Sequence, residues 1–351
     1  MGYRFVFRAD GNKNIGAGHV MRCLSLACAA KELGNECLFV TADSSYSNVI
    51  ESFGIANEIL DTDYSKMNDE LYKLDILCDE YKPNLLIVDS YFVDDEYFSV
   101  VAKITNVVYI DDLVDCAYDV DCLINYNAYA NEDDYLRLYR VSEKSVPMLF
   151  LGVDYAPLRK EFQDVLLEHT TKKVKDILFS AGGADPEQIA LNFVIELIKN
   201  EIEFQKYNFH IVLGSFEPDK EEIRTLARGK DWIYVHENVS QMSELMLKCQ
   251  MAISAAGSTL YELCACGVPT ITYVLADNQI LGARALSNDG TMVYVGDFRI
   301  ANNFYRNMMF AIENLACDER KRCEMSLKAK SKIDGNGAKR TIVALIESIL
   351  K

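Results

Sequence analysis

A regular alternation of short apolar runs with longer amphipathic segments constrains the fold of this chain more than any other feature. The apolar runs have the length of β-strands, and the segments between them space their apolar residues as α-helices do. Strands that alternate with helices predict an α/β fold, in which helices cover both faces of a parallel sheet. The alternation restarts after Gly152–Pro157, which we interpret as a hinge. A chain of 351 residues is also long for a single core.

We therefore predict two Rossmann-like domains, residues 1–152 and 153–351, with a ligand cleft between them. Strands of the first domain are expected at Tyr3–Phe7, Cys37–Thr41, Leu85–Asp89, Val107–Asp111 and Cys122–Asn125, and helices at His19–Leu33, Asn48–Phe53, Asn68–Tyr81 and Asp95–Ile104. Strands of the second are expected at Asp176–Ser180, Phe209–Leu213, Ile233–Val235, Met251–Ser254, Thr270–Tyr273 and Met292–Val295. Its helices are expected at Glu187–Lys199, Lys220–Ala227, Met242–Leu247, Thr259–Cys266 and Leu281–Ser287. The C-terminal helices are expected at Asn302–Leu315, Glu319–Lys332 and Lys339–Leu350. These helices can pack back on the first domain.

The charge balance argues against nucleic acid as a partner. The 36 Lys and Arg residues stand against 53 Asp and Glu residues, a formal net charge of −17. Nucleic-acid-binding proteins usually present a basic face, and the densest basic segment, Glu319–Lys332, mixes both signs as a solvated helix does. An acidic protein can still bind an anionic metabolite if the site is built from backbone N–H groups.

No segment predicts export or stable membrane insertion. Met1–Phe7 is too short and too polar for a signal peptide, and the apolar runs have strand length. The 11 cysteines are scattered without a Cys-x-x-Cys pair, which predicts reduced thiols and a cytoplasmic protein. The four histidines lie far apart in sequence, so we expect no metal site, and no cofactor is expected either. Protein partners and oligomeric state stay open.

The first strand-to-helix turn carries the most unusual residues. Arg8 and Asp10 follow the first strand, and Gly16 and Gly18 precede His19 at the start of a helix. Free backbone N–H groups and the helix dipole at such a turn attract an anion such as phosphate. An imidazole at the same place can transfer protons near neutral pH. The turn therefore predicts proton chemistry beside a bound anion.

These residues also have structural interpretations. A histidine at a helix start is more often a cap or a packing residue than a catalyst. Arg8, Asp10 and Arg22 can form an ion-pair set that only holds the first loop in place. The functional interpretation rests on the combination of a strand end, two glycines and His19 with a second nucleotide-type loop later in the chain.

That second loop, the strongest nucleotide signal, runs from Ser254 to Glu262. Gly257 allows close approach of the backbone, and Ser258 or Thr259 can cap the following helix, which leaves N–H groups for a diphosphate. Glu262, one turn into the helix, can accept hydrogen bonds from ribose hydroxyls. A capped helix with an acidic first turn explains the same residues without a ligand.

Further polar or glycine-rich segments follow other predicted strands. Gly182–Pro186, which includes Gly183, can offer additional N–H donors. Asn278 and Gln279 carry amides that can hold sugar hydroxyls. All of these are also common loop residues. The remaining strand ends with the same ambiguity are Asp89–Tyr91 and Asp111–Asp112.

Several segments, in order along nearly the whole chain, carry a resemblance to a known family. They are Phe7–Asp10, Ile15–Leu24, Ile110–Leu113, Leu151–Gly152, Tyr155–Ala156, Leu158–Arg159, Gly182–Pro186, Asp277–Gln279, Asp334–Gly335 and Gly337–Ala338. Together they resemble the UDP-2,4-diacetamido-2,4,6-trideoxy-β-L-altropyranose hydrolases of pseudaminic acid biosynthesis. The resemblance implies the two-domain GT-B architecture of the MurG-type glycosyltransferases, with water in place of the acceptor and no catalytic metal.

The same resemblance implies roles for individual residues. The residues that it implies bind UDP are Gly183, Gly257, Ser258, Thr259 and Glu262. His19 would lie beside the anomeric carbon, with Tyr91 and Asn278 next to the sugar or the water. We add, as further substrate-binding candidates, Arg8, Asp10, Gly16, Gly18, Arg22 and Gln279. The positions that depart from the family pattern, and so leave the exact sugar open, are Ser90, Ala256, Tyr261 and Asn125–Asn127.

The resulting hypothesis is hydrolysis of a UDP-sugar with inversion at the anomeric carbon. His19 would take a proton from the attacking water, with Arg22 or Asp10 orienting the ring or its loop. Backbone N–H groups would stabilise the departing UDP. Two alternatives remain open: an inverting GT-B glycosyltransferase that uses a UDP-sugar donor, and a nucleotide-sugar-binding protein without catalysis.

Overall fold

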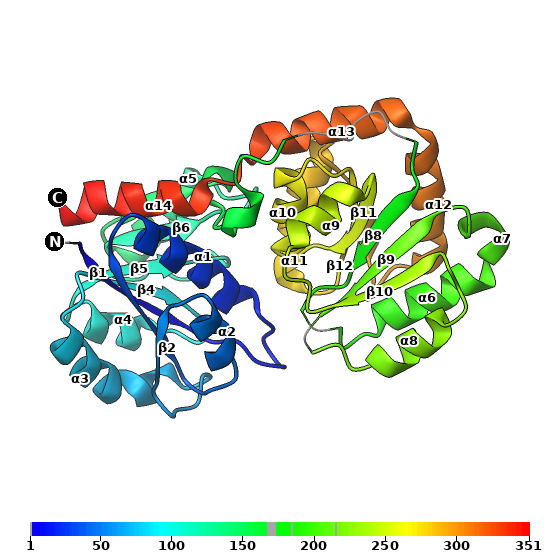
Figure 1. Ribbon diagram of the computed structural model, residues 1–351. Helices are drawn as coiled ribbons and strands as arrows, with labels where there is room; N and C mark the ends of the chain where they lie inside the picture. Colours follow the sequence, from blue (N-terminus) through cyan, green and yellow to red (C-terminus); the bar gives the residue numbers. More distant parts are fainter. Residues whose placement is uncertain (1, 167–172, 184, 215) are drawn as a thin grey trace. The chain divides into compact units, whose positions relative to one another are not determined.

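The computed structural model describes residues 2–166, 173–183, 185–214 and 216–351, and its contacts divide the chain into two compact units (Figure 1). The first unit consists of Met1–Arg159 together with Asn336–Lys351, and the second of Lys160–Gly335. The change of unit therefore falls a few residues beyond Gly152, and the last helix belongs with the first unit. Of the segments singled out above, Gly182–Pro186 contains one residue, Ala184, that lies outside the described residues.

The first unit is built on a parallel sheet. Its strands are β1 (Arg4–Ala9), β2 (Glu36–Thr41), β3 (Ala56–Ile59), β4 (Leu85–Asp89), β5 (Asn106–Ile110), β6 (Cys122–Asn125) and β7 (Met148–Leu151). They lie in the order β3-β2-β1-β4-β5-β6-β7, and every pair is parallel. The direction in which successive strands are added reverses between β1 and β4, so the loops after these two strands leave the sheet side by side.

Helices cover both faces of this sheet. They are α1 (Gly18–Glu32), α2 (Ser47–Ser52), α3 (Leu71–Tyr81), α4 (Asp95–Val101), α5 (Glu132–Ser142) and α14 (Gly337–Leu345). On one face α3, α4 and α5 bury their apolar side chains against alternate residues of the central strands, such as Val6, Leu86 and Val88. On the other face α1 packs on β1 and β2, and α14 packs on α1 (Figure 1). The central strands are thus buried on both sides, as continuous apolar runs in parallel sheets predict.

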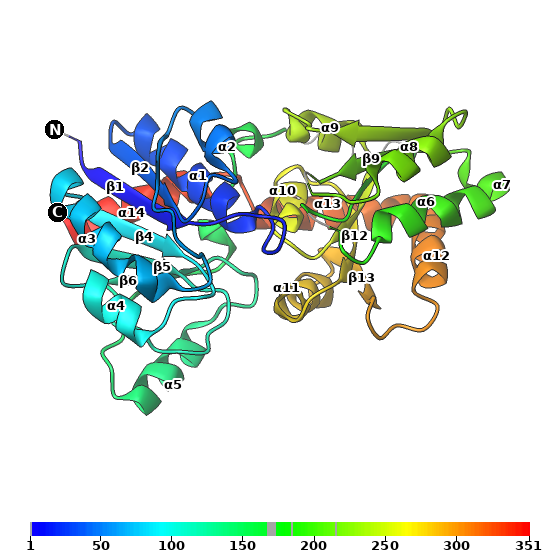
Figure 2. The same cartoon turned by 90° about the horizontal axis from the view of Figure 1, so that it is seen from below.

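The second unit repeats the architecture. Its strands are β8 (Asp176–Ser180), β9 (Asn208–Leu213), β10 (Ile233–Glu237), β11 (Met251–Ala255), β12 (Thr270–Val274) and β13 (Met292–Asp297). Their order is β10-β9-β8-β11-β12-β13, all parallel, with the reversal between β8 and β11. Its helices are α6 (Ile189–Lys199), α7 (Glu201–Phe204), α8 (Lys220–Ala227), α9 (Met242–Lys248), α10 (Thr259–Ala265), α11 (Asp277–Asn288), α12 (Phe304–Cys317) and α13 (Glu319–Lys332). One face packs against α6, α8 and α12, and α9, α10 and α11 lie on the opposite side (Figures 1 and 2).

The predicted α/β class with parallel sheets is confirmed, and every predicted strand and helix is present with its ends shifted by a few residues. Among the described residues, the strands and α-helices that were not predicted are β3, β7, α5 and the short α7. β3 has the sequence Ala-Asn-Glu-Ile and is largely exposed at the sheet edge, so it lacks an apolar pattern. α5 is strongly polar and buries only Tyr135 and Tyr139, which is too few apolar positions for a periodic signal.

A membrane-spanning helix needs about 20 predominantly apolar residues. Among the helices of the described residues, none has both the length and the apolar content needed to cross a membrane.

Candidate active site

A cluster of polar side chains forms where the loops after β1 and β4 meet. Ala9, the last residue of β1, pairs with Asp89, the last residue of β4. The loop after β1 is a small hairpin closed by the bridge between Asn12 and Gly16, and Gly16 adopts a positive φ of 73° that favours glycine. α1 then begins at Gly18, which places His19 in its first turn. The topology therefore brings His19 above the end of β4.

His19 and Asp89 form a buried hydrogen-bonded pair. The Nδ1 atom of His19 lies 2.6 Å from Oδ1 of Asp89. Asp89 is 1% exposed and His19 is 6% exposed. Because a carboxylate only accepts hydrogen bonds, Nδ1 must carry the hydrogen, which leaves the lone pair of a neutral ring on Nε2. This tautomer is the one that a general base requires.

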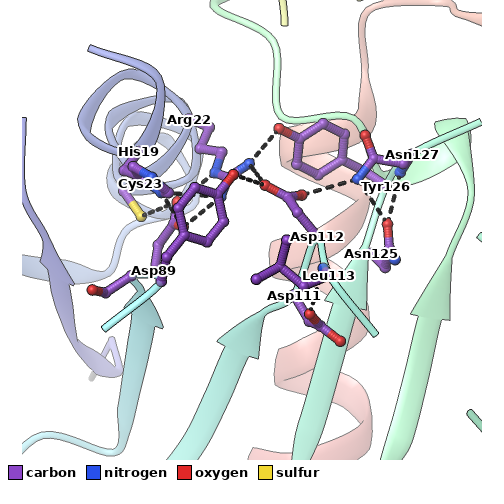
Figure 3. Close-up of polar contacts among 12 residues, drawn as sticks. His19, Arg22, Cys23, Asp89, Asp111, Asp112, Leu113, Asn125, Tyr126 and Asn127 are labelled. Atoms are coloured by element: carbon purple, nitrogen blue, oxygen red, sulfur yellow. Dashed lines mark hydrogen bonds and ion pairs between the residues drawn. The ribbon is translucent and has the colours of Figure 1, made fainter. Parts of the chain in front are cut away.

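Arg22 fixes the carboxylate of Asp89. Its Nη2 donates to Oδ1 over 2.5 Å, and its Nε donates to Oδ2 (Figure 3). Burial opposes ionisation of Asp89, but the charges and hydrogen bonds of Arg22 and His19 outweigh it and hold the pKa of Asp89 well below its usual range. Nη2 of Arg22 also lies 3.1 Å from Nδ1 of His19. Both nitrogens carry hydrogen, so this approach reflects their shared acceptor, Asp89.

Two neighbouring side chains complete the immediate surroundings of this pair. The Cys23 thiol lies 3.7 Å from Oδ2 of Asp89, and burial together with that carboxylate raises its pKa well above the usual value. Cys23 is therefore a neutral donor and not a nucleophile. The ring of Tyr91 meets the His19 ring edge-on, with centroids 4.6 Å apart, and Tyr91 is 37% exposed. The structure thus brings together three predicted residues, His19, Arg22 and Tyr91.

Arg8 and Asp10 belong to a different, fully buried cluster. Arg8 is 0% exposed and donates to both carboxylate oxygens of Glu70, over 2.7 and 2.6 Å. It also donates to Asp10 over 2.6 Å, and the other oxygen of Asp10 accepts from the backbone N–H of Ala42. The Tyr97 hydroxyl donates to Glu70. This geometry favours the structural alternative for Arg8 and Asp10, which tie the first loop to the rest of the unit, and it assigns the orientation of His19 to Asp89 in place of Asp10.

In the second unit, the loops predicted to bind UDP lie at neighbouring strand ends. Ser180 at the end of β8 pairs with Ser254 of β11, so the turns that follow, with Gly182–Gly183 and Gly257, are neighbours. A Cβ atom at Gly257 would meet nothing within 4 Å, which shows open space beside that backbone. Gly257 and Ser258 are exposed, and the predicted residues that are half-buried are Gly183, Thr259 and Glu262.

Two details of this region differ from the sequence prediction. Ser258 precedes α10 in a helical conformation, and its hydroxyl makes no capping hydrogen bond, because that backbone geometry turns the side chain away from the first N–H groups. Asn278 and Gln279 belong to the first turn of α11, which starts at Asp277 and not at Leu281. Gln279 accepts the backbone N–H of Leu275 over 2.8 Å, whereas Asn278 is exposed.

Two cavities of the first unit lie away from His19 and Asp89. One of about 540 Å³ lies between β3 and α3 and is lined by residues such as Leu38, Ile59 and Ile76. Its lining contains none of the predicted site residues. Sequence reasoning left Asp89 as an ambiguous strand end and missed its part in the site. The signal that could have found it is its place at the end of the strand that neighbours β1, where ligands of doubly wound sheets bind.

Comparison with known sequences identifies relatives over most of the chain. Residues 177–340 match the glycosyltransferase family 28 C-terminal domain. An uncharacterised protein of Methanocaldococcus jannaschii is 27% identical over 77% of this chain and 55% of its own length. The UDP-2,4-diacetamido-2,4,6-trideoxy-β-L-altropyranose hydrolase of Campylobacter jejuni subsp. jejuni is 28% identical over 74% of this chain and 87% of its own length. A Helicobacter pylori protein, named as a pseudaminic acid cytidylyltransferase and the same hydrolase, is 24% identical over 91% of this chain and 52% of its own length.

The chain thus spans about half the length of the first and the last of these three relatives. Among solved structures, Acinetobacter baumannii MurG superposes with a TM-score of 0.66 at 14% identity, over 98% of this chain and 99% of MurG. That likeness confirms the predicted GT-B fold, and the two named hydrolases confirm the resemblance seen in the motifs. This GT-B chain is therefore a sequence relative of the UDP-2,4-diacetamido-2,4,6-trideoxy-β-L-altropyranose hydrolases.

Proposed function

We propose that this protein hydrolyses a UDP-linked sugar to UDP and the free sugar. The observation that carries the proposal is the pairing of His19 with Asp89 at the meeting point of the loops after β1 and β4. Asp89 holds Nδ1–H, so the lone pair of Nε2 can accept a proton from water. The names of two relatives supply the reaction class.

In the proposed reaction, the oxygen of a water molecule attacks the anomeric carbon while its proton passes to Nε2 of His19. The bond between the anomeric carbon and the UDP oxygen breaks, and its electron pair leaves with UDP. Attack from the side opposite the leaving group inverts the configuration at that carbon. The imidazolium that forms lies beside the ionised Asp89, which stabilises it.

The second unit supplies the UDP site in this proposal. Its support is the match of residues 177–340 to a glycosyltransferase domain and the open space at Gly257. N–H groups of the turns after β8 and β11 would take up the charge on the diphosphate. Glu262 would accept hydrogen bonds from the ribose, and Asn278, exposed at the start of α11, would contact the sugar.

We further propose UDP-2,4-diacetamido-2,4,6-trideoxy-β-L-altropyranose, or a close UDP-diacetamido-trideoxy sugar, as the substrate, which would place the reaction in pseudaminic acid biosynthesis. The support is the printed activity of the Campylobacter jejuni and Helicobacter pylori relatives. A second candidate, an inverting glycosyltransferase with a UDP-sugar donor, is favoured by the family 28 match and the MurG fold. The two differ in whether an acceptor other than water is needed.

The test is incubation of the purified protein with UDP-diacetamido sugars and no acceptor, followed by NMR. Hydrolysis predicts release of UDP and free sugar, with the inverted anomer appearing first. His19→Ala is expected to lower turnover about 100- to 10,000-fold, the usual contribution of a positioned base. UDP affinity, measured by calorimetry, should stay unchanged in that variant. Normal turnover by His19→Ala would reject the proposal, and turnover only with an added acceptor would favour the transferase.

A further inference from the structure

Asp112 follows β5 and connects the loops around the candidate active site through hydrogen bonds. Its Oδ2 accepts from Nη1 of Arg22 over 2.6 Å and from the Tyr91 hydroxyl over 2.9 Å. Its Oδ1 accepts from Nδ2 of Asn127 over 2.9 Å (Figure 3). Its backbone carbonyl accepts from the Tyr129 hydroxyl over 2.6 Å. These donors come from α1, from the loop after β4 and from the loop after β6. One carboxylate therefore links three separate segments.

We propose that Asp112 is a positioning residue of this site, which acts on His19 through Arg22 and Tyr91. The inference rests on the proposed function, because it assigns Asp112 a part in the same reaction. Asp112 itself does not contact the imidazole. It holds Arg22 and Tyr91, the two side chains that lie against the ring.

Arg22 is the first of these two side chains. Its guanidinium is divided between Asp89 and Asp112, and its Nη1 also donates to the Tyr126 hydroxyl over 2.8 Å. Nε and Nη2 of Arg22 meet the two oxygens of Asp89 as a fork, and the bond from Nη1 to Asp112 helps to hold the guanidinium in that orientation. The carboxylate plane in turn sets the direction of the His19 ring.

Tyr91 is the second side chain. Its hydroxyl is held by Asp112, while its ring stands edge-on to the His19 ring at 80°. Asp112 therefore fixes the aromatic wall beside the imidazole at the exposed side of the site. Loss of this bond would remove one restraint on the position of the Tyr91 ring beside His19.

Charge gives Asp112 a second effect on the imidazole. The groups that face His19 and its pair are Arg22 and Cys23 on α1, Asp89 on β4, Tyr91 after β4, Asp112 after β5 and Tyr126 after β6. Burial raises the pKa of both Cys23 and Tyr126 above their usual values, so these two stay neutral. Two carboxylates then face one guanidinium, and the excess negative charge favours the imidazolium that forms during the reaction.

The test compares Asp112→Asn with Asp115→Asn, which removes an exposed carboxylate from the same loop. For Asp112→Asn we expect kcat to fall roughly 10- to 100-fold, the range for losing a buried hydrogen bond to a charged group. KM for the UDP-sugar and calorimetric affinity for UDP should stay unchanged, because neither involves Asp112. The Asp115→Asn control should behave as the wild type in all three measurements.

A second measurement does not depend on turnover. The His19 ring is followed by ¹H–¹⁵N NMR as a function of pH, with its signal assigned by comparison with His19→Ala. Asp112→Asn should move the protonation midpoint of this ring to lower pH, and Asp115→Asn should not move it. A merely structural role would lower thermal stability and leave the midpoint in place.

The outcomes separate the two proposals. If the wild type hydrolyses UDP-sugar, His19→Ala does not, and Asp112→Asn retains full kcat with an unmoved midpoint, the role of Asp112 is refuted while the hydrolase proposal stands. If the wild type releases no UDP, the hydrolase proposal fails, and the NMR titration alone decides whether Asp112 acts on His19.

Discussion

Replacing Asp89 by Asn tests the central feature of the site. Asn has nearly the same shape as Asp, but one of its oxygens becomes an NH₂ group that donates. Asp89 accepts from Nδ1 of His19 and from Nε and Nη2 of Arg22, so the amide must direct its NH₂ at one of these N–H groups. If the NH₂ faces His19, the ring must shift its hydrogen to Nε2 to accept it. The lone pair is then on the wrong nitrogen, and the base is lost.

The expected losses of kcat and of unfolding free energy in Asp89→Asn follow from these contacts. Loss of the base tautomer should lower kcat about 100- to 10,000-fold. Removing one partner of a buried ion pair costs about 3–5 kcal/mol. Arg22 keeps its contact with Asp112, so the lower end, about 3 kcal/mol, applies. For a unit of this size, that loss lowers Tm by about 6–12 °C.

Glu70→Gln is the matched control for Asp89→Asn. Glu70 is likewise a fully buried carboxylate that pairs with an arginine, Arg8, but it has no contact with His19. Both variants are assayed for UDP release well below their melting temperatures and for thermal unfolding by calorimetry. We expect similar losses of Tm, with a large loss of kcat in Asp89→Asn only. Asp89→Asn with more than a tenth of wild-type kcat would refute the assignment of Asp89 as the group that sets the His19 tautomer.

Two further predictions concern the second unit. Glu262→Ala should weaken UDP binding by about tenfold through the loss of a ribose hydrogen bond, and unchanged affinity in calorimetry would argue against that contact. His210 lies 2.9 Å from both His236 and Asp176, and burial lowers the pKa of both imidazoles below the usual 6.5. Below about pH 6.5 the unfolded chain therefore binds more protons than the folded chain. The two neutral imidazoles make their full contribution to the free energy of unfolding above that pH, and this contribution is lost as the pH falls. Urea unfolding at pH 8 and pH 5 measures the effect; equal loss in wild type and His236→Gln would contradict it.

The elements with strong local patterns could be predicted from the sequence. β1, β4, β8 and β11 each have a mainly apolar sequence because both faces of a central parallel strand are buried, and that burial is visible in the residue types. β3, in which Asn and Glu lie between Ala56 and Ile59, and the polar helix α5 left no such trace. These elements form because the sheet edge and the adjacent core offer them partners, which is tertiary information.

In the candidate site, too, some features could be predicted from the sequence and others depend on the fold. The sequence by itself determined that a glycine-rich turn with His19 follows the first strand, and that a glycine–serine turn follows a buried strand in the second half, because such turns are local in the chain. Only the tertiary structure decided which carboxylate orients His19. The strand order puts β4 beside β1, so Asp89 contacts the His19 ring, for which Arg22 or Asp10 was predicted as the orienting residue, and Asp10 pairs with Arg8. Contacts between residues about 70 positions apart depend on sheet topology, and no spacing within one segment records that.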